Sequence, residues 1–183
     1  MTALLSLYHR AAAGLDASAG WILPTAARLV FAGVLLAYFW GSAMTKVGEG
    51  LFSPSIGAYS QIFPKVFEAA GYDPGQMGGF ATLVVLAGTW AEFLLPALLV
   101  IGLMTRFAAL GMVGFVIMQS LTDIYGHSAG PETVGAWFDR VSDALILDQR
   151  AFWMLLFLIL IVRGAGPLSL DRLFGGARTR LAA

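Results

Sequence analysis

The sequence predicts an all-α protein: a transmembrane four-helix bundle with short amphipathic helices in the outer loops. Composition is the first reason. The chain of 183 residues is 58% hydrophobic and only 12% charged, and its mean hydropathy is +0.79, whereas soluble domains are about half apolar and a quarter charged. The second reason is a set of four apolar stretches, at residues 29–46, 80–104, 107–121 and 151–162.

Each stretch can be extended to the roughly 20 helical residues that cross a bilayer core. The first extends back to Pro24, because proline is favoured in the first turn of a helix. The second already has the length. The third reaches it if the helix continues to Tyr125. The fourth must include Arg163 and part of the segment after it, with the Arg163 side chain reaching the interface.

The distribution of basic residues predicts the orientation of the bundle. With four spans and a cytoplasmic N-terminus, seven basic residues lie inside and four outside, which is the bias expected of membrane proteins. The inside set is Arg10, Arg28, Arg106, Arg163, Arg172, Arg178 and Arg180, and the outside set is Lys46, Lys65, Arg140 and Arg150. Both termini are therefore predicted to be cytoplasmic.

This topology divides the chain into three parts: a cytoplasmic N-terminal segment (1–23), a four-span membrane domain (24–171) and a cytoplasmic Arg-rich tail (172–183). No removable signal peptide is seen, so the first span is expected to direct insertion. Residues 132–147 carry apolar side chains at helical spacing and predict an amphipathic helix at the outer interface. A second short outer helix is expected over residues 64–71.

Small residues in the first stretch indicate close helix packing. Gly33, Ala37 and Gly41 recur every four residues, and such a face lets two helix backbones approach each other. Gly111 and Gly114 can act in the same way in the third stretch, although chance explains that pair equally well.

Glu92 is the most informative single residue, because it lies at the midpoint of the second apolar stretch. A carboxylate at that depth is costly, so it should face the bundle interior and find a partner. Without a nearby cation, burial favours the neutral acid, which could donate a hydrogen bond or pass a proton. The structural alternative, equally weighted, is an interhelical hydrogen bond to Gln119, Ser42 or Tyr38.

Other polar residues point to packing more than to chemistry. Arg28 and Asp171 fall at the cytoplasmic ends of the first and fourth spans, so they are predicted to form an ion pair that pins the bundle. Asp123 and His127 are four residues apart, but a structural metal site usually needs four ligands. No metal site is therefore predicted, and these two residues are interpreted as part of a solvated loop.

Composition also excludes several classes of function. The chain has no cysteine and a net charge of zero. It therefore offers no disulfide, thiolate metal ligand or thiol–disulfide exchange, and nothing in its net charge indicates nucleic acid as a partner. No nucleophile–base pair or phosphate-binding glycine loop is visible.

Five segments in order carry a family resemblance: RLVFAG at 28–33, GSAMTK at 41–46, Glu92, GLMTRFAAL at 102–110 and GAGPLSLD at 164–171. With these segments the chain resembles the DoxX family of small bacterial membrane proteins. The resemblance implies a four-helix protein of the bacterial inner membrane, related to subunits of membrane redox modules. It is also similar in outline to quinone-reducing bundles that oxidise thiols, but those need cysteine pairs.

Two hypotheses follow, from different functional classes. The first is a quinone-interacting subunit that works with a separate redox partner, in which Glu92 meets the quinone in a pocket lined by Trp90, Tyr38 and Trp40. The second is a non-catalytic membrane scaffold or maturation partner for another protein. Solute transport is a third hypothesis, weaker because four spans offer little pathway unless the chain forms an oligomer.

Overall fold

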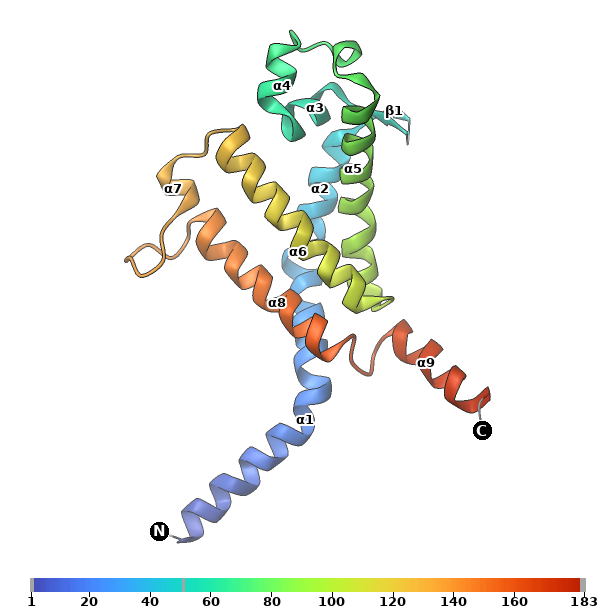
Figure 1. Cartoon of the computed structure of the whole chain (residues 1–183). Helices are drawn as coiled ribbons and strands as arrows, with labels where there is room; N and C mark the ends of the chain where they lie inside the picture. The colour runs from blue at the N-terminus through green and yellow to red at the C-terminus, as the bar shows by residue number, and fades with distance from the viewer. Residues whose placement is uncertain (1, 51, 182–183) are drawn as a thin grey trace.

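The computed structural model describes residues 2–50 and 52–181, and four long apolar helical regions pack together in it (Figure 1). They are formed by α1 (Thr2–Val34) with α2 (Leu36–Lys46), α5 (Gly78–Ile101), α6 (Thr105–Leu121) and α8 (Arg150–Arg163). The predicted all-α four-helix bundle is confirmed.

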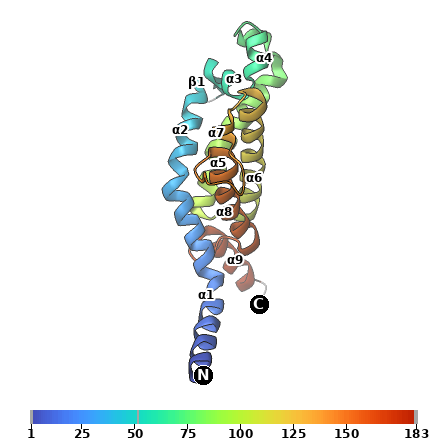
Figure 2. The same ribbon diagram turned by 90° about the vertical axis from the view of Figure 1, so that its left-hand side faces the viewer.

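The first helix is longer than the sequence predicts. The backbone amides of Leu35 and Phe39 continue the helical hydrogen bonding across the boundary between α1 and α2, so the two form one rod of roughly 65 Å (Figure 2). The prediction that Pro24 begins this helix is wrong, since the helix begins at Thr2. Hydropathy alone marks Ala3–Val34 as the candidate span. Burial against the other helices instead begins at Pro24 and continues to Lys46, so we place the span there.

The four regions form a closed ring of neighbours. The α1–α2 rod contacts α5 and α8, and α6 lies between α5 and α8. Large side chains with no exposed surface fill the centre, contributed by all four regions: Phe31, Phe39, Leu99, Met112, Phe157 and Leu160. Close van der Waals packing of these side chains against one another helps to hold the regions together in one bundle.

The outward faces of the bundle are also apolar. Leu29, Leu94, Ile117 and Leu155, one from each region, are each about half exposed or more. Soluble proteins rarely expose apolar surface on every side, whereas lipid-facing helices must. With four helices long and apolar enough to span a membrane, the chain is a multi-pass membrane protein.

The ends of two spans differ from expectation. The third continues through a π-helical turn at Thr122–Gly126, as predicted. The fourth gains its length before Arg150, where a π-helical turn at Leu145–Gln149 leads into α8. It stops at Arg163, since Gly164 leaves the helix at φ +78°. The predicted extension beyond Arg163 is therefore wrong.

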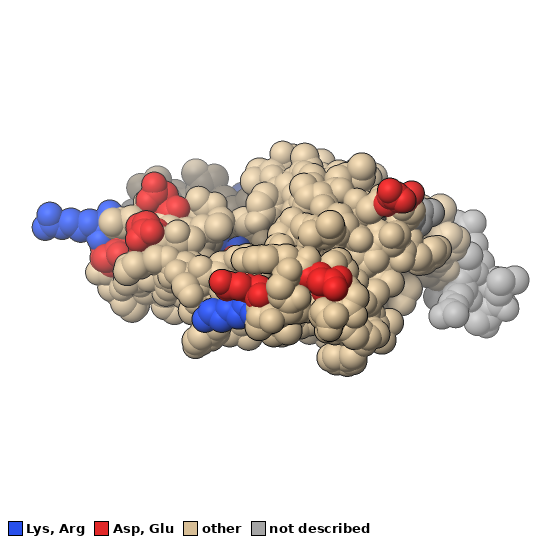
Figure 3. Space-filling model, turned by 90° about the horizontal axis from the view of Figure 1, so that it is seen from above, with Lys and Arg blue, Asp and Glu red and all other residues tan. Residues whose placement is uncertain are grey.

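The connections at one end of the bundle form what we call the loop end. The first contains a hairpin of β1 (Val47–Gly50) and β2 (Ser53–Pro54), then α3 (Ile56–Ile62), α4 (Pro64–Ala69) and η1 (Pro74–Gln76). Helix α4 confirms the short helix expected at 64–71, while the hairpin and α3 were not foreseen. Seen from above, acidic side chains are scattered over this end with fewer basic ones between them (Figure 3).

The second connection corrects the amphipathic helix predicted over 132–147. Only α7 (Pro131–Val134) is helical before the π-helical turn, and Gly135 ends it at φ +74°. Phe138 also has a left-handed φ of +67° and is fully exposed. Apolar side chains at helical spacing therefore did not produce a helix over 132–147, because the backbone turns away from helical geometry at Gly135.

The opposite end, which we call the turn end, holds the three-residue turn between α5 and α6, and both chain termini extend from it (Figure 1). The tail predicted for 172–183 is helical as far as it is described, within α9 (Leu170–Leu181). The small-residue face of the first helix was predicted to pack inside the bundle, and that prediction is wrong. Gly33, Ala37 and Gly41 are exposed, and the buried face of that helix carries larger side chains.

Candidate functional site

The buried carboxylate of Glu92 forms an ion pair with Lys46. The Lys46 Nζ lies 2.8 Å from Glu92 Oε2, and the two side chains are 8% and 1% exposed. Lys46 is the last residue of α2, and its ammonium turns back along the helix to the hydroxyl and carbonyl of Ser42, at 2.7 and 3.2 Å. That direction moves the charge by about one turn toward the middle of the bundle, where it meets Glu92 on α5.

The partners predicted for Glu92 are corrected by this arrangement. Gln119 donates instead to the hydroxyl of Tyr38, at 2.9 Å, and Ser42 contacts Lys46. The interior position predicted for Glu92 is confirmed by its burial. The neutral acid was predicted only in the absence of a nearby cation, and the Lys46 ammonium is such a cation. A lysine that ends an apolar stretch one turn after a serine is the signal that could have identified this partner.

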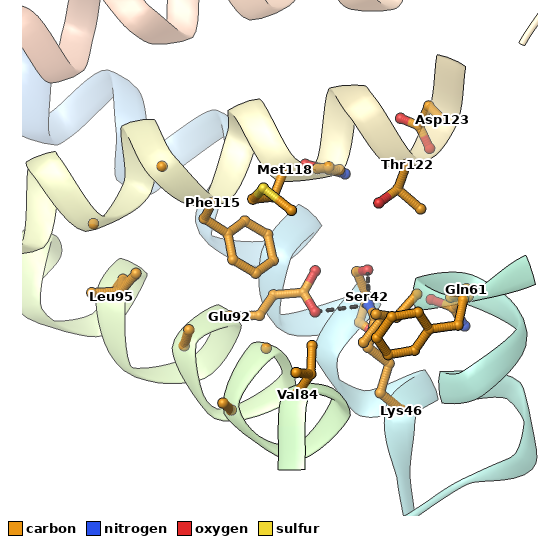
Figure 4. A pocket seen from close by; sticks show the side chains of 18 of the residues that line it. Ser42, Lys46, Gln61, Val84, Glu92, Leu95, Phe115, Met118, Thr122 and Asp123 are labelled. Carbon is orange, nitrogen blue, oxygen red and sulfur yellow. Dashed lines mark hydrogen bonds and ion pairs between the residues drawn. The ribbon is translucent and has the colours of Figure 1, made fainter. Parts of the chain in front are cut away.

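A cavity of about 620 Å³ opens beside this ion pair, between α5 and α6 (Figure 4). The two helices are close near their turn, where Gly111 lies so near Leu95 that a Cβ at Gly111 would come within 2.9 Å of a Leu95 methyl carbon. They separate toward the loop end (Figure 1), where Gly114 also lines the space and has no neighbour within 4 Å of a Cβ position.

The walls of the cavity are largely apolar. Polar groups lie at the Lys46–Glu92 ion pair and at the rim near Asp123. Apolar lining comes from both helices and from the loop end: Ile62, Phe63, Val84, Leu95, Phe115 and Met118. In Figure 4 the carboxylate of Glu92 points between the helices, with one oxygen on Lys46 and the other directed toward the α6 wall. Among the described residues no donor reaches that second oxygen, Oε1.

At the rim of the cavity Asp123 forms a second ion pair. Its Oδ2 lies 2.6 Å from Nη2 of Arg150. The Arg150 side chain is 3% exposed. It also donates to the Ser120 hydroxyl at 2.8 Å, and its guanidinium lies over the ring of Trp153. The prediction of a solvated loop at Asp123 is wrong, because the π-helical turns on both sides place Asp123 and Arg150 opposite each other. The signal available in the sequence for this ion pair was the position of Arg150 directly before an apolar stretch.

His127 also lines the cavity, and its Nε2 lies 3.0 Å from the backbone oxygen of Gln61. This contact ties the end of the third span to α3. In the described part of the chain no three His, Cys, Asp or Glu residues are grouped as metal ligands would be.

The three aromatic residues predicted to form a quinone pocket are not brought together around Glu92. Trp90 packs between Phe52 and Phe93, with ring centroids 5.8 and 6.2 Å away. Trp40 donates to the Phe93 carbonyl at 3.1 Å and is 42% exposed, and Tyr38 stands at the bundle surface, 39% exposed. None of the three is among the residues that line the cavity.

Arg28 and Asp171 both lie at the turn end, as predicted, but they do not form a direct ion pair. Arg28 donates to four backbone carbonyls, those of Leu99, Val100, Ala165 and Leu168, at 2.5–3.0 Å. The last carbonyls of a helix have no partner within it. Arg28 therefore ties the end of α5 to the segment that follows α8.

Asp171 completes the same arrangement from the other side. Its carboxylate accepts hydrogen bonds from the amides of Met104 and Thr105, at 2.6 and 2.9 Å, and so caps the start of α6. Burial alone would raise the pKa of Asp171. The hydrogen bonds from Thr105 and Met104, with the charge of Arg28, outweigh burial and hold this pKa below its usual value. The pinning role is thus exerted through the backbone rather than through an ion pair.

Comparison of the chain with protein-family models, curated proteins and solved structures finds no match. The cavity and the groups that face it are accordingly the basis for assigning a function.

Proposed function

We propose that this protein binds a quinone-type ligand in the cavity beside Glu92 and serves as a quinone-interacting subunit of a membrane redox module. The single observation that carries the proposal is an apolar cavity between α5 and α6, closed on one side by the end of α2, with one buried ion pair in its wall. DoxX-like ancestry, placement in the bacterial inner membrane and cytoplasmic termini belong to the same proposal.

The dimensions and chemistry of the cavity support this class of ligand. Sites for small molecules enclose about 300–1,000 Å³, and they combine apolar walls with a few polar groups that fix orientation. A volume of about 620 Å³ lies within that range. A quinone has a flat ring with two oxygen atoms and an apolar tail, and its lipid solubility brings it to a cavity among membrane spans.

The redox chemistry itself must involve a second component. This chain has no cysteine, so the thiol chemistry of other quinone-reducing bundles cannot take place on its own side chains. We assign the electron-donating or electron-accepting centre to a partner protein, and binding and orientation of the quinone to the cavity.

The test is a substitution that fills the cavity without moving the backbone. Gly114→Leu places a side chain into the cavity from α6, where a Cβ meets nothing within 4 Å. Gly33→Leu is the matched control, since Gly33 is equally unobstructed but lies on the outer face of the first helix. A decyl-substituted benzoquinone should raise the unfolding temperature of the wild type and of Gly33→Leu, and should have little effect on Gly114→Leu. Equal shifts in all three proteins would place quinone binding elsewhere or in the detergent.

The scaffold hypothesis has its own supporting observation. Trp137, Phe138 and Val141 are 63%, 102% and 54% exposed on the irregular segment before the fourth span. Exposed apolar groups of this kind mark interaction sites. A protein partner that binds the wild type but not Phe138→Asp, together with no quinone response in either, would favour the scaffold.

A further inference from the structure

We propose that the cavity binds the reduced, hydroxyl-bearing quinol in preference to the oxidised quinone, with Glu92 accepting a hydrogen bond from a quinol hydroxyl. This inference rests on the proposed function and specifies the redox form of its ligand.

The donors of Lys46 are already occupied. An ammonium group has three N–H donors, and the Lys46 Nζ has three partners: Glu92 Oε2 and both oxygens of Ser42. A ligand carbonyl that approaches this end of the cavity therefore finds no free N–H on Lys46. The only donor left in the Lys46–Glu92–Ser42 group is the Ser42 hydroxyl proton.

Two hydrogen-bond acceptors that face the cavity lack a donor among the described residues. Glu92 Oε1 has no donor among the described residues, and in Figure 4 it points away from Lys46 toward the α6 wall. Gln119 also lines the cavity, and its Oε1 is buried without a partner, while one N–H of its Nε2 is donated to Tyr38. A buried acceptor without a donor, such as Gln119 Oε1, costs free energy, and Glu92 Oε1 is a second open acceptor. A ligand that brings hydrogen-bond donors to these two atoms is therefore favoured.

The two redox forms of a quinone differ in this property. A quinol carries two hydroxyl groups that can donate, whereas an oxidised quinone carries two carbonyl oxygens that only accept. Glu92 forms an ion pair with the Lys46 ammonium at 2.8 Å, and the oxygens of a carboxylate in an ion pair accept hydrogen bonds but do not donate them. A quinone carbonyl beside Oε1 would therefore be repelled, while a quinol hydroxyl there would form a charge-assisted hydrogen bond.

Hydrogen bonds to charged groups are strong enough to make the preference measurable. Their usual contribution corresponds to about a tenfold or larger difference in dissociation constant. We therefore expect the wild type to bind the decyl-substituted hydroquinone at least about tenfold more tightly than the corresponding benzoquinone.

The experiment measures both dissociation constants under anaerobic conditions, with wild-type protein in detergent micelles. Binding to Gly114→Leu is subtracted to remove partition into the detergent. Glu92→Gln should bring the ratio of the two constants close to one, because the amide presents both a donor and an acceptor. Glu132→Gln, which changes an exposed acid outside the cavity, should leave the ratio unchanged.

A second variant keeps the test decisive if Glu92→Gln does not fold with Lys46 unpaired. In Lys46→Met/Glu92→Gln both charges are absent, and the preference for quinol should again be lost. Equal or tighter binding of the benzoquinone by the wild type would overturn the inference and leave the proposed function in place. An unchanged preference in the Glu92 variants would also overturn it. Binding of neither form would refute the proposed function itself.

Discussion

Lys46→Met should be strongly destabilising, because it leaves the Glu92 carboxylate buried without a cation. Glu92 is 1% exposed, and Lys46 is the only described residue that donates to it. Removal of one partner from a buried ion pair typically costs about 3–5 kcal/mol. That is a large part of the roughly 5–15 kcal/mol by which folded proteins are stable.

Replacement of both charges should recover most of this loss. Lys46→Met/Glu92→Met exchanges the pair for two apolar side chains of similar length, and such exchanges are often neutral or stabilising. The double variant is therefore expected within about 2 kcal/mol of the wild type. The difference between the double variant and the sum of the single variants measures the coupling of the pair.

The assay is reversible unfolding in mixed micelles with increasing sodium dodecyl sulfate, followed by tryptophan fluorescence. Lys65→Met is the matched control, because it makes the same substitution at an exposed lysine of the loop end and should change stability by no more than about 0.5 kcal/mol. If Lys46→Met were as mild as this control, or if the double variant were as unstable as both single changes added together, the ion pair would not have the role assigned to it.

Two further predictions concern the turn end. Asp171→Asn should cost about 1 kcal/mol at neutral pH, as loss of a helix cap does. Because the pKa of Asp171 is lowered in the folded protein, its contribution is present above the ordinary aspartate value of about 3.9 and is lost as the pH falls through the folded value. Unfolding measured against pH should show the two proteins converging in acid, and a constant difference would contradict this account. Gly102→Ala should cost roughly 2–4 kcal/mol, since Gly102 has φ +69° and a Cβ there would lie 2.6 Å from the Cβ of Ser169. Gly33→Ala, in open space on a helix, should cost nothing in the same unfolding assay, and equal losses in both would refute the steric argument.

Local features of the sequence predicted the helices but not their ends. Apolar length identifies a span by itself, because the bilayer core demands about 20 helical residues whatever the other helices do. The extension of the fourth helix depends on what lies beside it. Arg150 can enter the buried region only because Asp123 and Ser120 are there to receive it.

The same distinction applies to the candidate site. Sequence alone determined that Glu92 lies inside the bundle, because a carboxylate in the middle of an apolar stretch has no lower-cost position. Only the tertiary structure decided that Lys46 is its partner, since the two residues are 46 positions apart and their meeting depends on the packing of α2 against α5. The cavity, too, exists only in three dimensions. It requires α5 and α6 to be in contact at Leu95 and Gly111 and to separate beyond them, and the angle between two helices comes from the fit of their side chains, which no single stretch of sequence contains.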